Sequence, residues 1–230
     1  MLATVAAFVL RYPLKKWPLL FYALAALIVV LSFAVTLGFF GAWWKPLAII
    51  LVQKCTLSLA LFVVVMFIGV FPRDSSVGRY LRPIRAELSI IAWILSLGHM
   101  VAYLMSYLPQ VSSGIEHMNA ATLSALAVAL VLFALLLVLG VTSFSFVKRT
   151  MKLATWKRVQ MLAYPFFILV YVHLLLMLLP AALKGGLAAQ ASVAVYSIIF
   201  IAYIVLRLYR AAKDRSARAE ASAAADSQAD

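Results

Sequence analysis

The stretch that decides the fold is residues 85–107, RAELSIIAWILSLGHMVAYLMSY, which is apolar enough to cross a bilayer. It carries a histidine, His99, well inside the expected hydrocarbon region, and an ionisable side chain at that depth marks a candidate functional site. A second intramembrane histidine, His173, lies in the apolar stretch 159–180, VQMLAYPFFILVYVHLLLMLLP. These two histidines are the feature around which the rest of the sequence is interpreted.

The composition excludes an ordinary soluble domain. Of the 230 residues 67% are hydrophobic and 12% are charged, whereas a soluble chain is about half apolar and about a quarter charged. The single cysteine, Cys55, permits no internal disulfide and no cysteine metal cage, and it is expected to pack as a small hydrophobe. The sequence therefore predicts an integral membrane protein.

Six apolar runs are separated by turn residues, and none shows the two-residue alternation of an outer-membrane strand. We expect an all-α bundle of six transmembrane helices in one domain, residues 1–210. The tail, residues 211–230, is expected to begin as a continuation of the last helix and to end disordered in the cytoplasm. The chain contains no Gly-rich phosphate loop, so it has no nicotinamide or flavin domain of its own. The six expected spans are 18–37, 48–70, 87–108, 120–147, 159–180 and 191–208.

The basic residues alternate from one set of loops to the other. The segments 1–17, 71–86, 148–158 and 207–230 hold 17 Lys or Arg residues, whereas the loops 38–47, 109–119 and 181–190 hold 2. The positive-inside rule therefore places both termini in the cytoplasm, with the chain in the cytoplasmic (inner) membrane. Topology and contact with lipid headgroups account for nearly all of the net charge of +13, so the expected partner is the bilayer and no nucleic acid is involved.

The two histidines are expected at nearly the same depth, because the third and fifth spans run in the same direction. His99 follows Arg85 by 14 residues and His173 follows Arg158 by 15. At ~1.5 Å per residue both lie roughly 20 Å above the inner charge layer. Two neutral imidazoles that face each other in an apolar slab suit the axial positions of haem iron. In the alternative interpretation, each histidine hydrogen-bonds a neighbouring helix.

Several neighbouring residues leave two interpretations open. Lys54 either snorkels to the outer surface or neutralises a haem propionate, and Gln160 either caps its helix or hydrogen-bonds a ligand. His117 is expected to be a solvated loop residue, with contact to an electron acceptor as the alternative. Small residues near His99 either leave room for a flat macrocycle or allow close helix packing: Ala92, Ser96, Gly98, Ala102 and Ser106.

With these residues, the segment from Phe71 to Leu179 resembles the ferric-reductase-like transmembrane domain, and most closely its small haem-binding membrane subunits of the MsrQ/YedZ type. The Thr-Ser-Phe run at 142–144 and the basic loop after it fit that pattern. Gln160 stands where the family has a further histidine. The other residues that carry the resemblance are Arg82, Arg85, Trp93, His99, Trp156, Tyr164 and His173.

The resemblance implies one b-type haem, with His99 and His173 as axial ligands of its iron. It implies an electron-transfer subunit of an oxidoreductase, which accepts electrons from a cytoplasmic flavoprotein or quinol and passes them to an extracytoplasmic reductase or other acceptor. FMN or a quinone is the candidate second cofactor on the cytoplasmic side, near Gln160. The candidate contacts for the incoming electrons or the flavin are Arg82, Arg85, Arg149 and Arg158.

Two other functions compete with this interpretation. A transporter or channel would use His99 and His173 as a proton or metal relay, but the sequence lacks inverted repeats, Gly-broken half-helices and an intramembrane carboxylate. A scaffold subunit without haem is the second competitor. The colour of the purified protein separates all three.

Overall fold

The computed structural model describes residues 2–72, 74–112, 114 and 118–226, and these residues form helices joined by turns, without a strand. Six of the helical segments are long and apolar enough to cross a membrane. They confirm the predicted all-helical fold with six segments that could span a membrane, and helices suit lipid because they bond most of their backbone polar groups internally. The side on which the termini lie stays a prediction. The six segments are Pro18–Thr36, Ala42–Ile68, Ser76–Ser112, Ala120–Ser143, Leu153–Leu183 and Leu187–Ala217.

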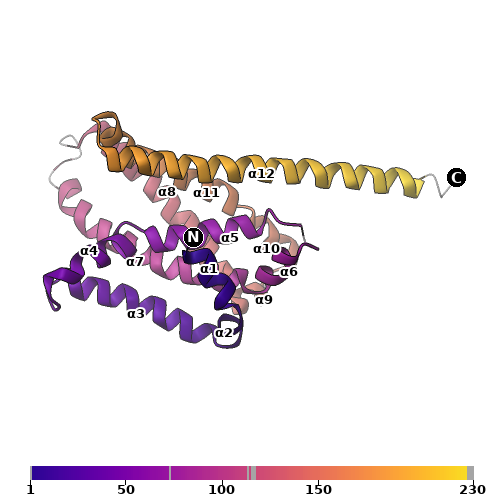
Figure 1. Cartoon of the computed structure of the whole chain (residues 1–230), viewed down its shortest axis with the longest axis horizontal. Coiled ribbons are helices and arrows are strands. Elements are labelled where there is room, and N and C mark those ends of the chain that lie inside the picture. Colours follow the sequence, from indigo (N-terminus) through magenta and orange to yellow (C-terminus); the bar gives the residue numbers. More distant parts are fainter. Residues whose placement is uncertain (1, 73, 113, 115–117, 227–230) are drawn as a thin grey trace.

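Short helices gather at one end of the bundle, which we call the basic end (Figure 1). They include α1 (Leu2–Val9) and α2 (Arg11–Lys16), which precede α3 (Pro18–Thr36). The Arg11 guanidinium lies 4.2 Å from the centre of the Tyr80 ring, and the Tyr80 hydroxyl donates to the Phe8 carbonyl at 3.1 Å. These contacts hold the N-terminal helices against the short helix that contains Tyr80. The other short helices at this end are α6 (Ser76–Leu81), η3 (Arg82–Ile84), α9 (Ser145–Thr150) and α10 (Leu153–Gln160).

The second span is interrupted, although the sequence predicted one helix there. It begins with η1 (Ala42–Trp44), α4 (Lys45–Ala48) and the wider helical turn η2 (Ile49–Gln53), and it resumes as α5 (Thr56–Ile68). Between η2 and α5 the chain leaves the helix at Lys54 and Cys55, where Cys55 has φ = 55°. The expectation of an unbroken span is therefore wrong at these two residues.

The long helices pair into two groups of three. In the first group α7 (Arg85–Ser112) packs on α3 and α5. In the second, α11 (Ala163–Leu183) packs on α8 (Ala120–Ser143) and on α12 (Leu187–Asp226). The groups meet where α7 packs on α8, whereas α7 and α11 are not among the main packing pairs. Phe62 of α5 packs against all three apolar core clusters, so α5 also joins the two groups.

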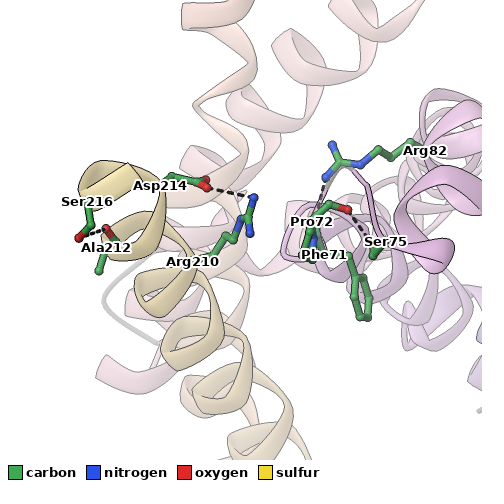
Figure 2. Close-up of polar contacts among 8 residues, drawn as sticks. All are labelled: Phe71, Pro72, Ser75, Arg82, Arg210, Ala212, Asp214 and Ser216. Atoms are coloured by element: carbon green, nitrogen blue, oxygen red, sulfur yellow. Dashed lines mark hydrogen bonds and ion pairs between the residues drawn. The ribbon is translucent and has the colours of Figure 1, made fainter. Parts of the chain in front are cut away.

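The last helix is longer than a membrane span. α12 has 40 residues and, at ~1.5 Å per residue, is about 60 Å long, roughly twice the thickness of a hydrocarbon core. Figure 1 shows α12 projecting beyond the rest of the bundle. Further along α12, Arg210 pairs with Asp214 at 3.0 Å, one helical turn away (Figure 2). The last helix thus continues into the segment 211–230 as expected, and the disorder of that tail stays a prediction.

Candidate functional site

His99 is held by the interruption of the second span. Its Nδ1 donates a hydrogen bond to the Gln53 carbonyl at 2.5 Å, and its ring packs beside Tyr103 with 4.7 Å between ring centres. The carbonyl acceptor requires the proton on Nδ1, so the lone pair of Nε2 is the one available to a metal. The alternative in which each histidine hydrogen-bonds a neighbouring helix therefore holds for His99, and it leaves the ligand nitrogen free.

His173, on α11, has a different environment. Its Nδ1 is buried and has no hydrogen-bond partner among the described residues. His99 lies on α7 and His173 on α11, so the two histidines belong to different groups of helices.

The two histidines fit the axial positions of a haem better than they fit a bare metal ion. Within the described ranges no cluster of three or more His, Cys, Asp or Glu side chains gathers, so a bare ion would find two protein ligands. A porphyrin brings four nitrogens of its own and needs from the protein only axial ligands and an apolar surround. Two partly buried imidazoles on different spans supply that donor set.

Three of the five small residues near His99, namely Ala92, Ser96 and Gly98, lie where helices pack closely, which fits the second of the two roles that the sequence left open. The Ser58 hydroxyl donates to the Ala92 carbonyl at 2.6 Å and lies 2.5 Å from the Ser96 hydroxyl, so α5 and α7 approach closely. At Gly98 an added Cβ would lie 2.8 Å from the Val52 side chain. These residues therefore bring α7 against α5 and η2.

A cavity of about 250 Å³ lies at the basic end, between α5, α7, α8, α10 and α11. Its lining is mostly apolar and aromatic and includes the indoles of Trp93 and Trp156, and there is no carboxylate among the described residues that line it. The indole Nε1 of Trp93 is buried and has no hydrogen-bond partner among the described residues. The cavity is thus suited to a planar ring that bears hydrogen-bond acceptors or negative charge. Its polar lining consists of Arg82, Arg85, Ser89, Ser143, Lys148 and Gln160.

The structure brings two of the four predicted arginines to this cavity. Arg85 donates from Nε to the Val65 carbonyl at 3.1 Å, and Arg82 donates from Nη2 to the Phe71 carbonyl at 2.6 Å (Figure 2). Arg149 and Arg158 are exposed and do not line the cavity.

Lys148 contributes the third cation of the cavity, a role that the sequence interpretation missed. Its Nζ lies 4.3 Å from the centre of the Trp156 ring. The basic loop 148–158 was recognised from the sequence, and only the direction of each side chain separates Lys148 from its neighbours.

Gln160 does not cap its helix, so the first of the two interpretations that the sequence left open is wrong. It is the last residue of α10, and its Nε2 donates to the Thr142 hydroxyl at 3.0 Å. The indole Nε1 of Trp156 donates to the Thr142 carbonyl at 3.0 Å as well, so both side chains tie α10 to the end of α8. Lys54 is exposed beside the interruption of the second span, and His117 lies outside the described residues.

Residues 54–171 match the family described as ferric reductase like transmembrane component, and the chain belongs to that family. The match defines the class of protein as a membrane redox component. The matched segment begins at the interruption of the second span and contains His99 and all the residues that line the basic-end cavity, whereas His173 lies two residues beyond it.

The chain is also similar to an uncharacterized protein of Treponema pallidum (strain Nichols), with 40% identity over 158 residues. The similarity covers 69% of this chain and 44% of the relative, so the chain spans less than half of that relative's length. No solved structure matches the chain.

Proposed function

We propose that the chain is a b-type cytochrome subunit that carries electrons across the cytoplasmic membrane through one haem held by His99 and His173. The observation that carries the proposal is the state of the two rings. The Nδ1 proton of His99 is bonded to a carbonyl, which leaves the Nε2 lone pair to bind iron, and His173 lies in the other group of helices with a buried Nδ1 that has no hydrogen-bond partner among the described residues. A haem held by both histidines would supply one-electron transfer.

The chain's own residues supply position and an apolar medium. The Gln53 carbonyl orients His99, and both imidazoles lie in apolar spans. Among the described residues, the charged side chains that line the basic-end cavity are all cationic, which favours an incoming anion. This division of roles requires no acid–base catalyst, because an electron carrier moves no bonded group.

The donor enters at the basic-end cavity in this proposal, and the candidate donors are a quinol and a reduced flavin. Arg82, Arg85 and Lys148 provide positive charge, and Trp93 provides a buried indole donor. A volume of about 250 Å³ is slightly below the range of ~300–1,000 Å³ typical of pockets for whole ligands, so it suits a ring headgroup. The charge bias of the loops supports a cytoplasmic location for this end, and therefore an extracytoplasmic acceptor or reductase at the other.

The test of the haem is spectroscopic. The protein purified in detergent is expected to show a Soret band, and His99→Ala or His173→Ala is expected to lose haem. Gln160→Ala is the matched control, because this polar residue of the same span bonds Thr142 and is expected to leave the Soret band unchanged. Full haem content in both histidine variants would disprove the assigned ligands.

The test of the donor site is kinetic. Arg85→Gln removes a charge that lines the cavity, and it is expected to slow reduction of the haem by a quinol analogue or by reduced FMN. Arg149→Gln removes a charge that lies outside the cavity and is the control. Equal slowing in both variants would mean that only the overall charge of this end matters.

One observation favours the competing transporter function, namely the interruption of the second span at Lys54 and Cys55. Broken helices line substrate sites in many transporters. Here, however, the Gln53 carbonyl that the break releases is bonded to His99. A colourless purified protein that moves protons or metal ions in vesicles would favour the transporter over the cytochrome.

A further inference from the structure

The backbone at the interruption of the second span adopts an unusual conformation that has to be explained. Cys55 is the one residue other than glycine with a positive φ in the described part of the chain. The left-handed conformation is rare for a residue with a side chain, and it persists where the surrounding structure fixes it. The sequence around it, Ile-Leu-Val-Gln-Lys-Cys-Thr, contains neither glycine nor proline. Local preference therefore does not explain the break.

The break turns one carbonyl out of the helical ladder. The amide of Lys54 donates to the Ile49 carbonyl at 2.7 Å, and the amide of Cys55 donates to the Val52 carbonyl at 2.9 Å. The Gln53 carbonyl, which a continuous α-helix would use four residues further on, instead accepts from His99.

Gln53 is also held in place by a hydrogen bond from its side chain. Gln53 Nε2 donates to the Thr36 hydroxyl of α3 at 3.1 Å, and the Thr36 hydroxyl donates to the Ser32 carbonyl at 2.8 Å. The acceptor for His99 is thus held both by the break and by a bond to the neighbouring span. His173 has no such partner among the described residues.

We propose that the broken second span is a positioning element for His99, with Gln53 as the positioning residue. The Gln53 carbonyl keeps the proton on Nδ1, orients the ring and makes Nε2 a stronger donor than the corresponding nitrogen of His173. The inference rests on the proposed function, because it concerns the ligands of the proposed haem. A carbonyl behind a metal-bound histidine raises the basicity of that ligand, and loss of such a contact typically lowers metal affinity about 10- to 100-fold.

The experiment replaces each histidine in turn by an exogenous ring. His99→Gly and His173→Gly, each supplied with haem, are titrated in the full chain with imidazole and with N-methylimidazole, and binding is followed by recovery of the Soret band and by the midpoint potential. Imidazole carries the N–H that donates to the Gln53 carbonyl, whereas N-methylimidazole ligates iron but has no such donor. In ferric His99→Gly, imidazole is expected to bind at least about tenfold more tightly than N-methylimidazole. If that preference is confined to the ferric state, the potential with imidazole is lower by about 59 mV.

His173→Gly is the matched control and is expected to show a much smaller preference, because Nδ1 of His173 has no hydrogen-bond partner among the described residues. Equal preferences in the two variants, or a preference only in His173→Gly, would overturn the inference while the haem itself remained. A wild-type protein without haem would instead refute the proposed function. These two failures are therefore distinguishable.

A second pair of variants tests the break itself. Cys55→Gly permits the left-handed conformation and is expected to keep the wild-type potential, whereas Cys55→Val disfavours that conformation and is expected to raise the potential. A wild-type potential in folded Cys55→Val would count against the positioning role. If Cys55→Val fails to fold, an altered potential in Cys55→Gly counts against it in the same way.

Discussion

Substitution of Gly140 by alanine tests how tightly the two groups of helices are joined. A Cβ added at this residue of α8 would lie within contact distance of the Trp93 indole of α7, closer than atoms normally approach. The indole is not a flexible tip that moves aside, because it packs edge-on against Phe144 with 5.7 Å between ring centres. Overpacking of this kind costs about 1–3 kcal/mol, and the severity of the overlap places it at the upper end.

The helix itself favours the substitution, because alanine is better than glycine in a helix interior by about 1 kcal/mol. The net expectation is therefore a destabilisation of about 2 kcal/mol, which lowers Tm by about 4–8 °C in a chain of this size. Thermal unfolding in detergent measures it. Trp93→Leu removes the obstructing ring, so Gly140→Ala should cost much less stability in that background. The reasoning fails if Gly140→Ala is as stable as the wild type, or if it is equally destabilising in both backgrounds.

Three further outcomes are expected. Ser58→Ala removes a buried donor to α7 and should lower stability by about 1–3 kcal/mol in thermal unfolding, whereas Ser124→Ala, at an exposed position, should change it little. Phe167→Ala empties a site that is 1% exposed and should cost about 3–5 kcal/mol, seen as a loss of folded protein in detergent. In a chain whose native cysteine is replaced by serine, Lys184→Cys should react with an impermeant maleimide on intact cells and Arg149→Cys only after lysis; the reverse pattern would invert the proposed orientation.

The six spans were predictable because apolar length alone decides that a segment crosses a bilayer. The interruption at Lys54 and Cys55 was not, because nothing in the local sequence breaks a helix. The break is stabilised by contacts remote in sequence, from Gln53 to His99 and to Thr36. The only sequence signal of the interruption was the polar pair Gln53-Lys54 inside an apolar run. The same pair is also compatible with an unbroken helix whose lysine snorkels to the membrane surface.

The location of the basic-end cavity was predictable from the sequence, but the set of residues that line it was not. Arginines at the start of the third span indicated its neighbourhood, and Arg82 and Arg85 do line it. Which residues of the loop 148–158 face inward depends on how α9 and α10 are rotated. That rotation is set by the bonds from Trp156 and Gln160 to Thr142, which the sequence does not reveal.

The pairing of the long helices has a consequence for how the molecule is built. Each set of three is contiguous in the chain, so the first can assemble in the bilayer before the second has been synthesised. His99 belongs to the early half and His173 to the late half. In the proposed cytochrome, the haem iron would join the two halves only after both have been inserted. A cell short of haem would therefore accumulate chains whose two inserted halves can move apart.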